Sequence, residues 1–314
     1  MSAINQITSH DFGPRLAKRK RPLRHRQIST LMRFRINADL QYALTGAATY
    51  FFAFKCVETG GQHIVSEELK ITPEVSTEEF TVGVGMNRFT KLEIDARGPL
   101  EVSYQAEVET SHSVVNIDAL EADGNQSLVP DAVPFLFPSR YCQSDRLRQQ
   151  ALDLFGDIQG KYQTAAAISD WIFEHVAYQS GSSDETSSAV DTLEKRQGVC
   201  RDFAHLAVGF CRAMNIPARY VSVYADLLQP PDFHAVFEVF VGGMWYVLDP
   251  TRLAPLNGFV RIATGRDAAD VSVATVFGNS AFQSSVVSCV AVDAEYQHIT
   301  RDTLADAGQA IALL

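Results

Sequence analysis

Three residues in the second half of the chain could together carry out nucleophilic chemistry: Cys200, His234 and Asp249. A thiolate can attack a carbonyl carbon, an imidazole can transfer the proton, and a carboxylate can hold that imidazole in one orientation. The three residues are well separated in sequence. The hypothesis therefore depends on the elements that must bring them together.

Cys200 stands at the predicted start of a long amphipathic helix, in the segment RQGVCRDFAHLAVGFCRAM. At about 100° per residue, Cys200 and Cys211 share one apolar face of this helix. A thiolate at the helix N-terminus meets unpaired backbone N–H groups and the positive end of the helix dipole, which lowers the pKa of the thiol. Gly198 permits a tight approach of the chain just before the cysteine. We expect Cys200 to be a nucleophile if a base lies nearby, and Cys211 to be a small core residue.

His234 and Asp249 fall on a predicted hairpin, in the segment PPDFHAVFEVFVGGMWYVLDPTR. Two runs of β-forming residues are joined at Gly242-Gly243, which is a strong hairpin signal. If these glycines form the turn, Val241 faces Met244, and His234 and Asp249 become diagonal neighbours on one face of the ladder. An acid beside a histidine fixes its tautomer and orientation, as general-base catalysis requires. The spacing therefore predicts a Cys-His-Asp triad.

Two other acids lie near the predicted triad. Glu238 shares a strand face with His234 and could compete as the orienting acid, but Asp249 is better placed because it ends a strand. Asp202 falls in the first turn of the predicted helix, where a carboxylate complements the helix dipole or pins the preceding loop.

The spacing of possible metal ligands is unfavourable. His205 lies five residues after Cys200, about 140° around a helix, so the two cannot chelate one ion from one face. We expect His205 to be a satisfied helix histidine. A zinc site made by the three triad residues is stereochemically possible, but no paired-ligand spacing supports it, and no EF-hand loop is present. No metal and no cofactor are predicted.

Composition indicates a soluble globular protein of 314 residues. The five cysteines are dispersed, odd in number and without a CxxC pair, which favours a reducing compartment over a disulfide framework. No apolar run approaches the roughly 20 residues of a membrane span. The N-terminus has no apolar signal region. We expect a cytoplasmic protein with no membrane partner.

Charge is unevenly placed along the chain. Residues 1–30 hold seven basic residues and one acid, whereas the whole chain has a net charge of −10. A basic arm could tether the protein to nucleic acid or a membrane surface. Its polar composition instead favours an unstructured leader, or a start codon assigned too early, before Met32. The acidic remainder argues against nucleic-acid binding by the main fold.

The remaining chain divides into a β-rich part and a mixed part. Residues 31–130 alternate β-forming residues between turn signals, which predicts a β-sandwich. Residues 131–314 begin with helical periodicity, including a helix expected to start from an N-cap at Ser144 and to end at Gly156. The predicted fold class is α+β, with the N-terminal sandwich followed by a catalytic core.

Four segments, GVCRDFAHL, IPARYVS, DFHAVFEVF and WYVLDPTR, resemble the transglutaminase-like superfamily, in particular its bacterial cysteine proteases. The β-rich region resembles the N-terminal domain that these bacterial members carry. The resemblance implies a papain-like α+β core, with Cys200 as nucleophile, His234 as base and Asp249 as orienting acid. Many relatives have tryptophan two residues after the histidine, where this chain has Val236, a difference that bears on the shape of the substrate groove.

The expected function is thiol-dependent acyl transfer on a peptide or protein amide, most simply hydrolysis by a cysteine peptidase or amidase. Two alternatives stay open: transamidation, as by a protein-glutamine gamma-glutamyltransferase, and a non-catalytic peptide-binding module that keeps the fold. The backbone N–H of Cys200 is the expected first donor to the oxyanion, and the sequence does not identify the second.

Overall fold

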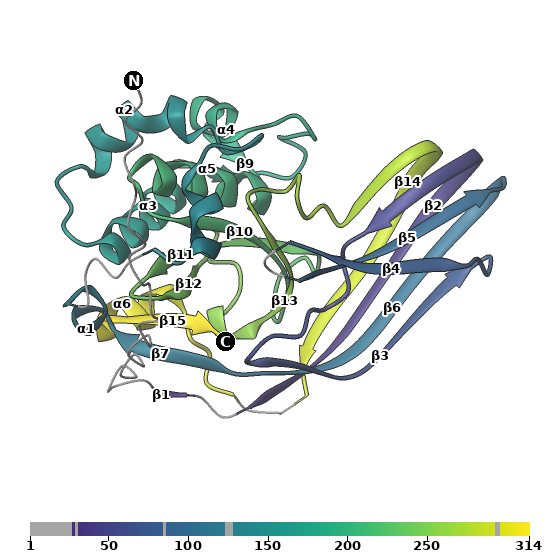
Figure 1. Ribbon diagram of the computed structural model, residues 1–314, viewed down its shortest axis with the longest axis horizontal. Helices are drawn as coiled ribbons and strands as arrows, with labels where there is room; N and C mark the ends of the chain where they lie inside the picture. The colour runs from purple at the N-terminus through teal and green to yellow at the C-terminus, as the bar shows by residue number, and fades with distance from the viewer. Residues whose placement is uncertain (1–26, 29–30, 84–85, 123–127, 293–295) are drawn as a thin grey trace, which may run out of the picture.

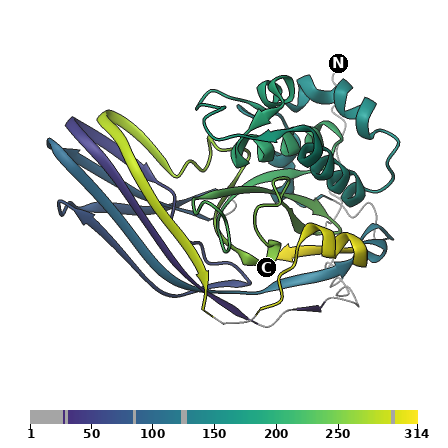
Figure 2. The same cartoon turned by 180° about the vertical axis from the view of Figure 1, so that it is seen from behind.

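A computed structural model describes residues 27–28, 31–83, 86–122, 128–292 and 296–314 of the chain. An elongated β-rich region extends from a core in which helices cover a sheet (Figure 1). Seen from behind, the two parts keep this end-to-end arrangement (Figure 2). The predicted α+β class with a β-rich N-terminal region is confirmed.

The β-rich region is an antiparallel sheet built around one very long strand. Its strands are β2 (Met32–Phe52), β3 (Gln62–Thr72), β4 (Thr77–Val82), β5 (Asn87–Asp95), β6 (Gly98–Thr110) and β14 (Ala274–Ala291). Along β2, buried and less buried residues alternate, so one face of the strand contributes to the core. β2 pairs with β6 along its first part and with β5 along its last part, while β14 pairs along nearly its whole length.

This sheet folds over on itself into two layers. One layer holds β3, β6 and the first part of β2, and the other holds β4, β5 and the last part of β2. The fold line passes through glycines: Gly98 and Gly278 have φ values of +119° and +120°. A Cβ on Gly278 would lie 2.4 Å from the carbonyl oxygen of Ala47, so this close approach requires glycine. The layers of the predicted sandwich thus share strands.

Pairing between strands crosses the predicted domain boundary at residue 130. β14 comes from the segment assigned to the core, yet it pairs with β2. Conversely, β7 (His112–Asn116) belongs to the segment assigned to the sandwich and pairs with β15 (Gln309–Leu313). Strands pair where their faces and register match. Local composition, from which the boundary was predicted, gives no information about this pairing.

The core places helices against a four-stranded antiparallel sheet of order β12-β11-β10-β13. Its strands are β10 (Ala218–Ala225), β11 (His234–Val241), β12 (Met244–Leu248) and β13 (Phe259–Gly265). Its helices are α2 (Ser144–Phe155), α3 (Lys161–His175), α4 (Ala189–Lys195) and α5 (Cys200–Ala213). α5 lies between the other helices and strands β10 and β11, and nearly all of its residues are buried. Ser144 is the first helical residue and not the N-cap, which is Gln143.

Smaller elements complete the described chain. They are β1 (Gln27–Ile28), α1 (Ile117–Ala122), the 3-10 helix η1 (Pro130–Leu136), β8 (Ala177–Tyr178), β9 (Gln197–Gly198), the 3-10 helix η2 (Leu256–Gly258) and α6 (Arg301–Ala307). The predicted leader, residues 1–30, lies outside the described residues except for 27–28, which form β1 and pair with β7. Within the described ranges, no helix is both long and apolar enough to cross a membrane.

Candidate active site

The N-terminus of α5 is fixed by a tight local contact. Asp202 accepts a hydrogen bond from the backbone N–H of Val199 through Oδ2 at 2.8 Å. A Cβ on Gly198 would lie 2.6 Å from the Cβ of Asp202, so glycine is needed for this approach. Asp202 therefore pins the loop before the helix, as predicted. Cys200, the first helical residue, is partly exposed, whereas Cys211 is buried in the core, also as predicted.

The hairpin of β11 and β12 has the predicted register. Val241 pairs with Met244 across a turn in which Gly242 and Gly243 both have positive φ. His234 is the first residue of β11, and Asp249 directly follows β12. This register places the imidazole and the carboxyl group side by side.

The imidazole of His234 has polar partners on two sides. Its Nε2 lies 2.9 Å from Oδ2 of Asp249, and the ring also interacts with the side chain of Cys200. Asp249 is itself held, because its Oδ1 accepts hydrogen bonds from the backbone N–H and the hydroxyl of Thr251 at 2.9 and 2.7 Å. The structure thus brings Cys200, His234 and Asp249 together in one chain of contacts.

Opposing effects act on the charge of His234. Burial disfavours the imidazolium, but the Asp249 carboxylate and, after it, Cys200 favour it more strongly and raise the pKa of His234 to about 10. At neutral pH the imidazole is therefore positively charged beside the sulfur. This electrostatic arrangement is the one that an imidazolium–thiolate pair requires.

The competing acid predicted from the sequence, Glu238, has other partners. Its carboxylate lies 2.6 Å from Nε of Arg219 and also pairs with the guanidinium of Arg261. All three side chains are buried, and they come from three neighbouring strands: Arg219 from β10, Glu238 from β11 and Arg261 from β13. The alternative in which Glu238 orients His234 is not supported, because two arginines occupy its carboxylate oxygens.

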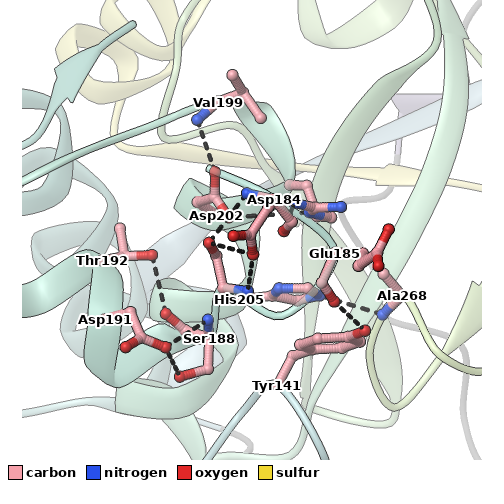
Figure 3. A network of polar contacts seen from close by, with 12 residues as sticks. Tyr141, Asp184, Glu185, Ser188, Asp191, Thr192, Val199, Asp202, His205 and Ala268 are labelled. Atoms are coloured by element: carbon pink, nitrogen blue, oxygen red, sulfur yellow. Dashed lines mark hydrogen bonds and ion pairs between the residues drawn. The ribbon is translucent and has the colours of Figure 1, made fainter. Parts of the chain in front are cut away.

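His205 is a neutral packing residue. Its Nε2 accepts a hydrogen bond from the backbone N–H of Ala268 at 3.1 Å, and its ring stacks on Tyr141 with centroids 5.0 Å apart (Figure 3). Burial lowers the pKa of His205 well below its ordinary value. Among the residues that the structure describes, no cluster of three or more His, Cys, Asp or Glu side chains could hold a metal ion.

Sequence reasoning missed Tyr178. Its strand β8 runs parallel to β9, which places Tyr178 opposite Gly198, just before the cysteine helix. The ring lies against Phe203 with centroids 5.8 Å apart, and the hydroxyl interacts with the backbone and the side chain of Cys200. Burial, followed by the charge of the Cys200 thiolate, raises the pKa of Tyr178 to about 12, so the hydroxyl keeps its proton at neutral pH. No local motif indicates this contact.

A pocket of about 380 Å³ opens beside the thiol. Its lining includes both Cys200 and His234. The rest mixes polar side chains, among them Glu185 and Arg201, with apolar ones, among them Phe233, Val271 and Ala274.

One wall of this pocket is the loop formed by residues 266–273. Arg212 donates a hydrogen bond to the carbonyl oxygen of Arg266 at 2.6 Å, and the backbone N–H of Tyr141 donates to Asp267 at 2.9 Å. The contact of His205 with Ala268 also holds this loop. Tyr141 and His205 therefore help to shape the pocket.

Comparison with known proteins defines the class. Residues 148–250 match the core of the transglutaminase-like superfamily, and residues 32–127 match the bacterial transglutaminase N-terminal domain. A crystal structure described as a "putative cysteine protease" from Cytophaga hutchinsonii is 42% identical, covers 92% of this chain and 100% of its own, and superposes with a TM-score of 0.88. The chain belongs to the transglutaminase-like superfamily and shares the fold of that structure.

Two mycobacterial proteins show weaker similarity. An uncharacterized protein of Mycobacterium leprae is 33% identical over 115 residues, which are 34% of this chain and 41% of that protein. An uncharacterized protein of Mycobacterium tuberculosis is 29% identical over 143 residues, which are 41% of this chain and 46% of that protein. The matched segments span less than half the length of these relatives.

Proposed function

We propose that this protein is a thiol-dependent hydrolase of peptide or glutamine-type amides, with Cys200 as nucleophile, His234 as general acid and base, and Asp249 as the orienting acid. The observation that supports this most is the chain of contacts from the Cys200 side chain through the His234 ring to Asp249. Nε2 of the ring is used by Asp249, which leaves Nδ1 for the sulfur. A buried imidazole held in this way can move a proton between the thiol and a substrate.

The reaction begins with attack of the Cys200 thiolate on the amide carbonyl carbon, which forms a C–S bond. The tetrahedral intermediate collapses, the C–N bond breaks, and His234 gives its Nδ1 proton to the leaving amine. Water then attacks the thioester while His234 accepts a proton from it. The C–S bond breaks, and the carboxylic acid and the thiolate are released. Asp249 stays ionised throughout and stabilises the imidazolium.

The oxyanion of each intermediate needs hydrogen-bond donors near the sulfur. The backbone N–H of Cys200 at the start of α5 is one donor. The second donor in this proposal is the hydroxyl of Tyr178, which already contacts the Cys200 backbone. When a substrate carbonyl enters, its oxygen lies between the Tyr178 hydroxyl and the Cys200 backbone N–H and accepts from both groups.

Access to the thiol favours catalysis over a binding role. Cys200 is partly exposed, and the adjoining pocket gives an acyl group a place beside the sulfur. The apolar lining from Phe233, Val271 and Ala274 suits an apolar side chain next to the scissile amide.

The deciding experiment incubates a mixture of glutamine-containing peptides and a primary amine in heavy-oxygen water, with mass spectrometry of the products. Hydrolysis places heavy oxygen in new carboxyl groups, whereas transamidation adds the mass of the amine. Cys200→Ala should abolish turnover, while Cys289→Ala, a matched loss of a thiol in the β-rich region, should leave it unchanged. If the amine captured most acyl groups, the proposed reaction would be transamidation and not hydrolysis. Equal turnover by wild type and Cys200→Ala would refute the proposed function.

A further inference from the structure

β14 presents an unusual free edge. Among the described residues, β2 is the only strand that pairs with it, so its other edge has no strand partner. Its 18 residues, ATVFGNSAFQSSVVSCVA, include no charged residue and no proline, although the whole chain carries a net charge of −10. Edge strands are normally protected from pairing by charges or prolines. The composition of β14 lacks this protection and therefore favours strand addition.

The first part of this edge begins at the catalytic pocket. Val273 and Ala274 line the pocket together with Cys200, and Ala274 is also the first residue of β14. From there the strand runs outward along the β-rich region (Figure 1). A polypeptide with its scissile amide at Cys200 could therefore continue along this edge.

An aromatic row crosses the sheet beside this edge. Phe277 on β14 contacts Phe51 on β2 at 6.2 Å, Phe51 contacts Phe80 on β4 at 6.3 Å, and Phe80 stacks on Phe89 of β5 at 5.6 Å between ring centroids. Phe277 is 61% exposed, and the other three rings are partly exposed. Contiguous apolar surface of this kind marks a binding site more often than chance exposure.

We propose that residues 274–278 of β14 bind an extended segment of a polypeptide substrate as an added strand, with apolar side chains at alternate positions resting on the Phe277–Phe51 end of the aromatic row. This inference rests on the proposed function, since it treats the pocket as the place of reaction. Backbone groups on the free edge give affinity for any sequence, and the aromatic row selects apolar side chains. The substrate class is therefore an unfolded or loosely folded protein segment, and not a single amino-acid amide.

A second copy of the chain fits this edge less well. Register shifts at Gly278/Ser280 and Phe282/Ser284 divide β14 into regular runs of five, three and eight residues. The short five-residue run lies at the pocket, and the strand bends between the two layers. Pairing of one short run buries far less than the roughly 1,200–2,000 Å² of a stable interface. A short run is sufficient for a peptide whose other end is held in the pocket.

The test measures peptide binding to the Cys200→Ala protein by fluorescence anisotropy. The probe is a fluorescein-labelled peptide of sequence GFTFQSVTVG, and its control is the same sequence N-methylated at alternate backbone nitrogens, which keeps the side chains but removes N–H donors. Strand addition requires the unmethylated peptide to bind much more tightly. Adding Phe277→Ser should raise the Kd about tenfold or more, as expected for losing a buried aromatic contact. Phe282→Ser, 58% exposed on the same strand beyond the bend, is the matched control and should leave the Kd unchanged.

The inference is overturned by equal binding of both peptides, by an equal loss with Phe277→Ser and Phe282→Ser, or by a dimer in light scattering that Phe277→Ser dissociates. Both substitutions are at exposed positions, and equal thermal midpoints confirm that folding is retained. Wild-type protein that cleaves short amides but fails to bind the decapeptide overturns only this inference. Protein that binds the decapeptide as expected but never cleaves any amide supports strand addition and refutes the proposed function.

Discussion

Nε2 of His234 lies 2.9 Å from Oδ2 of Asp249, and both side chains are buried. The two residues belong to one hairpin, whose Gly242-Gly243 turn sets their relation. The histidine and its acid are therefore positioned by one hairpin, and only Cys200 comes from a different element. The geometry of the site depends on how α5 packs against β11.

Asp249→Asn tests this unit directly. An amide in place of the carboxylate removes the charge that keeps His234 protonated and favours the wrong ring tautomer. We predict a fall in turnover of about 10²–10⁴, since the corresponding change costs on the order of 10⁴ in a serine triad. Steady-state kinetics on a peptide substrate measures it. Asp302→Asn, an exposed acid on α6, is the control and should have no effect. Near-normal turnover in Asp249→Asn would remove the acid from the mechanism.

Cys200 and Cys211 should differ strongly in reactivity, although they lie on the same helix. Burial raises the pKa of the Cys211 thiol above its ordinary value and hides it from reagents. His234, with its pKa raised to about 10, stays protonated at lower pH and keeps its positive charge beside Cys200. The preference of iodoacetamide for Cys200 should therefore widen as pH falls from about 8 to about 6, where ordinary thiols are protonated.

Peptide mapping of the alkylated protein measures this preference. His234→Ala should reduce it, because the imidazolium is lost while the N-terminus of α5 remains. Labelling in strong denaturant is the control, since both thiols should then react alike. Equal labelling of the folded protein at the lower pH would show that Cys200 is an ordinary structural residue.

The local parts of the site could be predicted from the sequence. The turn glycines determined the register of β11 and β12, and the apolar periodicity of α5 distinguished Cys200 from Cys211. Tyr178 could not be found in this way, because a parallel pairing of two short strands brings it to the thiol from outside any motif. The same limit applies to β14, whose first residue, Ala274, pairs with Phe52 across more than two hundred residues of chain. Such contacts depend on tertiary packing, which local periodicity does not encode.

Glu238→Gln should destabilise the fold without changing the chemistry. Burial opposes the Glu238 carboxylate, but Arg219 and Arg261 outweigh it and lower the pKa of Glu238 below 4.5. The neutral variant leaves two buried arginines without their counter-ion, which should cost about 3–5 kcal/mol in the free energy of unfolding. Denaturant titration measures this loss.

The same residue predicts a pH dependence. Because the folded-state pKa of Glu238 is lowered, its contribution to stability is present above 4.5 and is lost as pH falls through the folded value. In Glu238→Gln this part of the loss of stability at acid pH should be absent. The folded fraction of the variant should keep the kcat of wild type. A loss of kcat with unchanged stability would instead show that Glu238 takes part in catalysis.

Tyr178→Phe tests the second oxyanion donor. The variant keeps the ring against Phe203 and loses only the hydroxyl that contacts Cys200. Because this donor acts on the transition state, kcat should fall by about 10²–10³ while KM changes little. Tyr141→Phe is the matched control, since it removes a hydroxyl at the pocket that donates to the carbonyl oxygen of Glu185. Alkylation by iodoacetamide forms no oxyanion, so its rate at Cys200 should not fall in Tyr178→Phe. A parallel fall in alkylation and turnover would mean that Tyr178 positions the thiol, and unchanged kcat would remove it from the mechanism.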